Sequence, residues 1–347
     1  MGKDERWTGF SFVVVVVICG IAVAAVAAAS AGGQNFGDGR KVGAGREIPP
    51  YWAYAVNPPV GKSDGKAEAV DNSAKHLPGS EAAFTVAQTH DFFNVPDWHP
   101  DGHPVMPEIV ARGRKPDVFA CGYCHLSNGQ GRPENSSLAG LPVVYVVQQM
   151  SDFKNGLRKS SVPEHLPVAN MIKYETLANE QEIAQAAAYF SGIKPKPWIK
   201  VVETESVPKT HIAGWMLVVS EPREMEPIGA RIIETPENLE RTELRDDASG
   251  FIAYVPVGSV AKGKALATTG GDEKTVACGK CHGADLKGLA NVPGIAGRSP
   301  SYVVRQLFDM QDGARAGAAE QFMKPVVAKL NVEDMISLAA YTASLNP

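Results

Sequence analysis

The pattern of hydrophobic and polar positions changes along the chain of 347 residues, and each change predicts a different kind of structure. Residues 12–29 are almost all apolar, and no Asp, Glu, Lys or Arg occurs between residues 7 and 37. This run is long enough to span a bilayer, and the small residues Ala29-Ser30-Ala31 also fit a signal-peptide cleavage site. The pattern therefore predicts that residues 1–31 are a signal peptide or a membrane anchor through residues 8–31, and it leaves both open.

Residues 32–104 have little hydrophobic periodicity and contain many Gly and Pro residues. Such a stretch predicts an irregular N-terminal extension that lies over a domain as loops. We expect one short helix in it, with Ser80 as its N-cap and Ala82, Ala83 and Val86 following.

Helical periodicity appears in residues 105–195 and again in residues 258–347. In each stretch the last helix is expected to begin after an asparagine cap, Asn179 in the first and Asn331 in the second. Two further helices of the first stretch are expected at 107–112 and 145–153.

The stretch between them, residues 196–257, has short runs of β-branched and aromatic residues that prolines separate. These runs predict short strands of a small sheet at 198–202, 216–219, 231–233 and 251–255. The expected fold class is therefore mainly α, with two helical domains, a small β-containing segment between them and the irregular extension before them.

The two helical stretches are copies of each other. An offset of 157 residues pairs Cys121 with Cys278 and continues without a gap to Arg158 and Arg315. Five residues are then missing from the second copy, and the offset falls to 152. A repeat of about 90 residues is too long for a solenoid unit and indicates a duplicated small domain.

Composition excludes some classes of protein. The chain is 44% hydrophobic and 21% charged, which is typical of a globular protein. Its formal net charge is −4, which argues against nucleic acid as a partner.

Each copy carries the pentapeptide C-x-x-C-H, at Cys121-Gly122-Tyr123-Cys124-His125 and at Cys278-Gly279-Lys280-Cys281-His282. Two thiols at this spacing can each form a thioether to one haem, and the following histidine can bind the iron. Two C-x-x-C halves of one zinc site are the alternative, but a zinc site does not require a histidine directly after each second cysteine. The sequence therefore predicts two covalently bound haem c groups.

Methionine is the usual second axial ligand in electron-carrying c-type haems. Of the methionines in the two copies, only Met171 and Met323 align with each other, each 18 residues before a repeated tyrosine. A single methionine is more often core filler, but this matched pair predicts that Met171 and Met323 bind the two irons together with His125 and His282.

These features resemble the class I cytochromes c, and in particular their two-haem, two-domain periplasmic members. The resemblance rests on the C-G-Y-C-H, L-A-G, Y-V-V-Q-Q, G-L-R and A-A-A-Y-F segments of the first copy and their counterparts in the second. It covers about 105–195 and 258–347, so residues 32–104 and 196–257 are not explained by it. It implies a helical fold around each haem, low-spin iron and single-electron transfer.

The expected function is thus electron transfer between a redox donor and an acceptor protein, without a catalytic residue. A membrane dehydrogenase or terminal oxidase of a respiratory chain is a candidate partner, and the expected location is the periplasm, either soluble or anchored to the inner membrane. Two alternatives stay open: a dihaem peroxidase-like enzyme with one open iron site, and a haem subunit of a membrane complex.

Several residues near the copies have more than one interpretation. A proline-rich loop contains Trp98, His99 and His103, and we expect this loop to cover a haem edge. His99 and His103 are four residues apart and could share a metal only on a helix, which the prolines forbid. Two interpretations of Arg158 and Arg315 are open: their side chains contact haem propionates, or they lie on the solvent-exposed surface.

Overall fold

The computed structural model describes residues 48–58 and 71–347. The predicted signal peptide or anchor therefore lies outside the described residues, as does part of the N-terminal extension. Within the described ranges, no helix is both long and apolar enough to cross a membrane.

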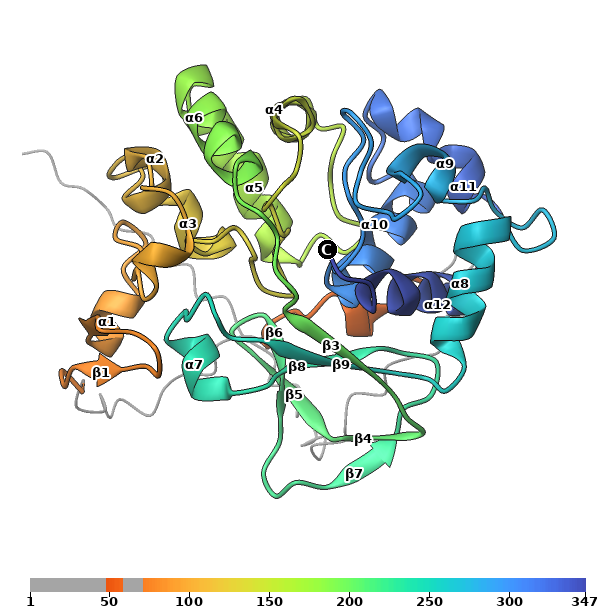
Figure 1. The fold of residues 1–347 in the computed structure, drawn as a ribbon, viewed down its shortest axis with the longest axis horizontal. Helices are drawn as coiled ribbons and strands as arrows, with labels where there is room; N and C mark the ends of the chain where they lie inside the picture. Colours follow the sequence, from red (N-terminus) through yellow and green to blue (C-terminus); the bar gives the residue numbers. More distant parts are fainter. Residues whose placement is uncertain (1–47, 59–70) are drawn as a thin grey trace, which may run out of the picture. The chain divides into compact units, whose positions relative to one another are not determined.

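The chain is mainly helical, as the sequence predicts, and its helices fall into two groups (Figure 1). The first group comprises α2 (Glu108–Ala111), α3 (Cys121–His125), α4 (Val143–Lys154), α5 (Leu166–Leu177) and α6 (Glu180–Ser191). The second group comprises α8 (Ser259–Thr269), α9 (Gly279–His282), α10 (Pro300–Asp312), η3 (Ala319–Phe322), α11 (Lys324–Val327) and α12 (Val332–Ala343).

The internal repeat reappears in these elements. Helix α10 begins 157 residues after α4, and α12 begins 152 residues after α6, which are the two offsets of the sequence repeat. Both last helices begin with a capping box. Asn179 accepts from the backbone N–H of Glu182, and Asn331 accepts from that of Asp334, each at 2.9 Å. The carboxylates of the two acidic residues accept from the asparagine N–H groups in return, which satisfies otherwise unpaired helix donors.

Short strands occupy the segment between the two helical groups. Strands β3 (Ile199–Glu203) and β9 (Phe251–Val255) pair in parallel, and β8 (Ile233–Pro236) pairs antiparallel with β9. Two separate ladders join β4 (Ser206–Pro208) to β7 (Met225–Pro227) and β5 (Thr210–Ala213) to β6 (Met216–Val219), and a short helix, α7 (Leu239–Glu243), follows β8. The prediction of short strands in this segment is confirmed, but they form three separate sheets instead of one. Strands β4, β5 and β7 lie outside the predicted runs, and β8 starts only at Ile233, where the expected run ends.

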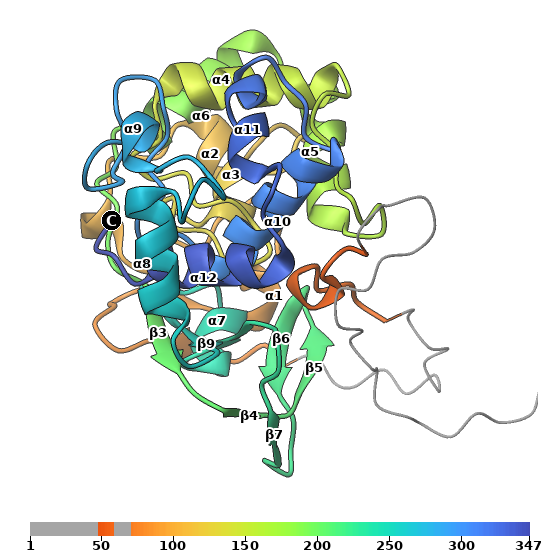
Figure 2. The ribbon, with the colours of Figure 1, turned by 90° about the vertical axis from the view of Figure 1, so that its right-hand side faces the viewer.

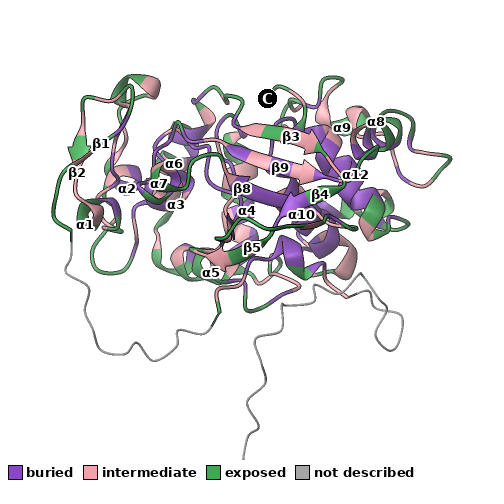
Figure 3. Cartoon of the chain, turned by 90° about the horizontal axis from the view of Figure 1, so that it is seen from below, coloured by how far each residue is buried: buried purple, intermediate pink, exposed green. Residues whose placement is uncertain are grey.

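The three-stranded sheet supports the second helical group. Helix α12 contacts β3, and α10 contacts β8. In the view from below, the purple ribbon of β8, α10 and α12 shows that this junction is buried (Figure 3). One core cluster joins Ile232 and Val255 of the sheet segment to Val304 and Leu338 of these helices.

The described part of the extension contains η1 (Tyr51–Ala53), β1 (Lys75–His76), β2 (Ala83–Phe84), α1 (Val86–Thr89) and η2 (Pro100–Gly102). The prediction of a helix that begins after Ser80 is wrong. The hydroxyl of Ser80 instead donates to the carbonyl of Trp98 at 2.5 Å, and Ala83 is in a strand. The helix begins at Val86 because Thr85 forms a complete capping box with Gln88.

Segment 51–54 of the extension packs into the second helical group. The phenol of Tyr54 donates to Asp309 at 2.8 Å, and Arg305 donates to the carbonyl of Ala53 at 2.6 Å. Trp52 and Tyr54 belong to the same buried core as α10 and α12. The extension is thus partly an integral element of the fold and not only a tether.

Helices α8 and α12 cross at very close range (Figure 2). A Cβ atom at Gly263 would lie 1.9 Å from the carbonyl oxygen of Ser337 and 2.8 Å from the Cβ of Tyr341. Glycine is therefore required at this crossing. In the first helical group, the helix before the C-x-x-C-H segment that contacts α6 is the four-residue α2, so the two copies differ at this point.

The two helical groups contact each other through three residue types that the repeat places in both copies. They are Tyr145 and Tyr302, Gln149 and Gln306, and Arg158 and Arg315. Arg158 donates to the hydroxyl of Tyr302 at 3.1 Å and to the side-chain oxygen of Gln306 at 3.2 Å. Arg315 donates in the same way to Tyr145 at 3.0 Å and to Gln149 at 2.8 Å. The contact is therefore reciprocal, as expected if an approximate two-fold axis relates the copies.

Backbone hydrogen bonds reinforce this contact. The N–H of Lys159 donates to Ala314 at 2.8 Å, and the N–H of Ala316 donates to Leu157 at 2.7 Å. Arg315 is only 5% exposed, so the interpretation of this arginine as a surface residue is wrong; it is part of the interface between the copies.

Candidate haem-binding sites

The histidines of the two C-x-x-C-H segments are held in the same way. His125 donates from Nδ1 to the carbonyl oxygen of Ser136 at 2.8 Å, and His282 donates from Nδ1 to that of Pro293 at 2.7 Å. Ser136 and Pro293 are themselves 157 residues apart. A backbone acceptor at Nδ1 fixes the ring and its tautomer, and this leaves the lone pair of Nε2 for a metal.

The electrostatics of both rings suit a neutral metal ligand. Burial lowers the pKa of His125 below its ordinary value, against the opposing effect of its bond to Ser136. Burial likewise lowers the pKa of His282. Because only an unprotonated Nε2 can bind iron, both histidines are in the required state at neutral pH.

The four cysteines of the two segments form no disulfide. Burial raises the pKa of the Cys121 thiol to about 12 and that of Cys278 to about 11. Free thiolates are therefore disfavoured there. A thiolate pair would be needed to hold zinc, whereas thioethers are uncharged and suit the buried surroundings.

The first segment opens into a cavity of about 750 Å³. Its lining includes Cys121, Cys124, His125 and Met171, so the four residues assigned to the first site surround one space. This volume lies within the roughly 300–1,000 Å³ typical of cofactor pockets. The donor set and the cavity therefore fit a haem, and Met150 is a second methionine on the same lining.

Segments outside the repeat close this cavity. Val86, His90 and Phe92 reach it from the extension, and Trp215 and Arg245 reach it from the β-containing segment. Arg245 also lies 3.4 Å above the ring of Tyr123, inside the first C-x-x-C-H segment, and donates to its carbonyl at 2.7 Å.

The sequence does not indicate that residues outside the repeat line this cavity. The positive φ of 67° at Trp215, after a glycine, is the feature that sets the tip of the β5–β6 hairpin. No local pattern in the sequence indicates which surface this tip covers.

The proline-rich loop does not cover the haem cavity in the expected way. Trp98 is buried against Leu77 and Leu244, and its Nε1 donates to the carbonyl of Leu244 at 2.8 Å. His103 bonds to Asp97 instead. The described lining of the first cavity does not include Trp98, His99 or His103. The extension reaches the cavity through residues 86–92, ahead of the loop that we expected.

The second site is more open. Cys281 is exposed, whereas Cys124 at the equivalent position is partly buried. Cys278 and Met323 both pack against the core cluster of α10 and α12. Two of the four predicted donors of the second site thus contact the same core.

Several known proteins are similar to this chain. No family model matches it. Cytochrome c-554(548) of Halomonas halodenitrificans is 36% identical over 75 residues, which are 21% of this chain and 90% of that protein. The chain belongs to the class I cytochromes c.

Longer matches show that this cytochrome is a distant relative of cytochrome c4 over about two thirds of its length. The thiosulfate dehydrogenase electron acceptor of Thiomonas intermedia is 25% identical over 234 residues, 66% of this chain and 80% of that one. Cytochrome c4 of Azotobacter vinelandii is 26% identical over 235 residues, 65% of this chain and 84% of that one.

Two solved structures are also similar. Thiosulfate dehydrogenase (TsdBA) from Marichromatium purpuratum has 24% identity and a TM-score of 0.44, and the match covers 66% of this chain and 37% of that one. Reduced recombinant cytochrome c4 from Pseudomonas stutzeri has 23% identity and a TM-score of 0.42, with coverage of 65% and 93%.

Proposed function

We propose that this chain is a dihaem c-type cytochrome that passes single electrons between redox proteins of the periplasm. The observation that carries the proposal is the repeated donor geometry. In both copies the histidine after the second cysteine is tied through Nδ1 to a backbone carbonyl 11 residues further along the chain. This geometry prepares two equivalent iron sites, which belong to helical domains at 105–195 and 258–347.

At the first site, Cys121 and Cys124 would hold the haem through thioethers, and His125 and Met171 would bind its iron. At the second site, Cys278, Cys281, His282 and Met323 would have the same roles. When bound, haem c supplies an iron that changes between the ferrous and ferric states. With a histidine and a methionine both bound, neither iron would keep an open position for a substrate, which favours a carrier over a peroxidase-like enzyme.

The surrounding chain gives the two sites different access. Residues of the extension and of the β-containing segment line the first site, whereas the exposed Cys281 leaves the second site nearer to solvent. Partner proteins would therefore exchange electrons more directly with the second site. This asymmetry is not a property of the repeat, because the added lining comes from Val86, His90, Phe92, Trp215 and Arg245.

A periplasmic dehydrogenase is the proposed electron donor. The support is the similarity to proteins named thiosulfate dehydrogenase electron acceptor in Thiomonas intermedia and Stutzerimonas stutzeri. The predicted N-terminal signal or anchor would place the cytochrome in the periplasm, either soluble or anchored to the inner membrane, within reach of such a partner.

The experiment is a haem and iron count on the purified chain. We expect two haems per chain in the wild type, one in Cys121→Ser, one in Cys278→Ser, and two in the matched control Cys19→Ser, whose cysteine lies outside both segments. One haem in the wild type, or an undiminished count in either motif variant, would refute the dihaem assignment.

A further inference from the structure

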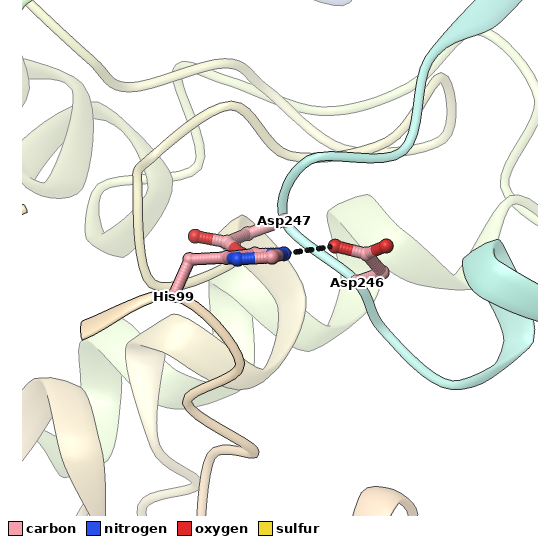
Figure 4. Close-up of side chains that lie close together, drawn as sticks. All are labelled: His99, Asp246 and Asp247. Carbon is pink, nitrogen blue, oxygen red and sulfur yellow. Dashed lines mark hydrogen bonds and ion pairs between the residues drawn. The ribbon is translucent and has the colours of Figure 1, made fainter. Parts of the chain in front are cut away.

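A polar cluster that does not line the first haem cavity lies between the proline-rich loop and the loop after α7. His99 directs Nε2 at Oδ1 of Asp246, 3.0 Å away, and Oδ1 of Asp247 is 4.0 Å from the same nitrogen (Figure 4). The side chain of Asp246 is fully buried, that of Asp247 is 5% exposed, and that of His99 is 20% exposed.

The two carboxylates of this cluster differ in their partners. Asp246 is paired through Oδ2 with Arg241 at 2.5 Å. Asp247 accepts from the hydroxyl of Ser127 at 2.6 Å through Oδ2, but its buried Oδ1 has no hydrogen-bond partner. His103, the other histidine of the loop, is bonded to Asp97. One buried carboxylate oxygen therefore points into the cluster without a partner, which is costly unless a cation or a proton occupies the space.

We propose that His99, Asp246 and Asp247 bind a divalent cation of the zinc class. In a tetrahedral zinc site the metal–ligand bonds are about 2.0–2.2 Å, which places ligand atoms about 3.4 Å apart. The observed separations of 3.0 and 4.0 Å lie on either side of that value. One imidazole with two carboxylates suits zinc better than calcium, which takes six to eight oxygen ligands.

The surroundings provide an entry path. A cavity of about 530 Å³ is lined by His99 and Asp247 together with Lys196 and Glu237. The remaining coordination position would face this cavity and hold water. The buried Oδ1 of Asp247, which has no hydrogen-bond partner, lies beside this path.

Such a cation would join three parts of the chain. His99 belongs to the extension, the two aspartates belong to the β-containing segment, and Ser127 is two residues after the haem-binding His125. Asn128 also donates to the backbone carbonyl of Asp247. The cation would therefore fasten the two segments that close the first haem cavity. This inference does not depend on the proposed electron transfer.

The test uses the purified haem-loaded protein, dialysed against EDTA and then titrated with Zn²⁺ by calorimetry, with bound zinc counted by mass spectrometry. We expect one zinc per chain in the wild type and at least 100-fold weaker binding in His99→Gln and Asp247→Asn. His76→Gln and Asp101→Asn, at exposed positions outside the cluster, are the matched controls and should bind as the wild type does.

A second measurement guards against misfolded variants. Zn²⁺ should raise the thermal midpoint of the wild type and the controls but not that of His99→Gln or Asp247→Asn, with the haem absorbance unchanged in all of them. Failure of the wild type to bind zinc, or equal binding by both cluster variants, would overturn the proposal.

Discussion

Removal of the Arg315 side chain should destabilise the contact between the two copies far more than removal of its repeat partner Arg158. Arg315 is 5% exposed and pairs with Glu320, which is 4% exposed, through contacts of 3.0 and 2.8 Å. Arg158 is only partly buried, and its described hydrogen bonds go to neutral groups. The repeat thus provides a matched comparison of the same residue with and without a buried ionic partner.

The magnitude follows from what each variant leaves behind. Arg315→Met leaves the carboxylate of Glu320 buried without an ionic partner, with only the amide of Gln149 donating to it at 3.3 Å. This should lower the free energy of unfolding by about 3–5 kcal/mol. Arg158→Met leaves no buried charge, and we expect a loss of about 1–2 kcal/mol. In the double variant Arg315→Met/Glu320→Met no orphan charge remains, so its loss should be smaller than the sum of the single losses by about 2 kcal/mol or more.

The assay is urea unfolding of the haem-loaded variants, followed by far-ultraviolet circular dichroism, because urea does not screen ion pairs. The haem count of each variant serves as the check on folding. Equal losses for Arg315→Met and Arg158→Met, or additive losses in the Glu320 cycle, would show that the buried ion pair does not hold the interface.

Two further predictions concern stability. Gly263→Ala should lower the free energy of unfolding in urea by about 1–3 kcal/mol, because its Cβ would meet the carbonyl of Ser337 at 1.9 Å. Gly192→Ala is the control, because a Cβ there has no neighbour closer than 3.5 Å. Equal losses in the two variants would contradict the close crossing of α8 and α12. Burial raises the pKa of Glu234 above its ordinary value despite bonds from Ser301 and Ser299. Its stabilising contribution is therefore present below about pH 4.3 and is lost as the pH rises through the folded value. The free energy of unfolding of Glu234→Gln should lack this decline, and parallel pH profiles for the two proteins would refute the assignment.

The internal repeat explains why much of the fold could be predicted from the sequence. Each pattern occurs twice, so a chance match in one copy can be rejected by the other. The asparagine caps at Asn179 and Asn331 were predicted in this way, and both capping boxes are present. The same comparison selected Met171, which the structure places on the first cavity, although its role as an iron ligand stays a prediction.

Segments without a repeat partner were predicted less well. The helix after Ser80 was wrong because a tertiary bond to Trp98 and the better capping box at Thr85 decided the local structure. The contact of Arg245 with Tyr123 joins residues 122 positions apart. No periodicity or composition signals such a contact, so the walls of the first cavity could be found only in the folded chain.

The central claim is that a histidine and a methionine bind each iron. Its most direct test is the near-infrared Met–iron charge-transfer absorption of the ferric protein, measured together with both midpoint potentials in Met171→Leu and Met323→Leu. Met150→Leu, on the same first cavity, and Met310→Leu, against the second core, are the matched controls. We predict that each ligand variant loses about half of the absorption and lowers one potential, because methionine sulfur favours ferrous iron, while the controls keep both. Full absorption and unchanged potentials in Met171→Leu and Met323→Leu would contradict the account.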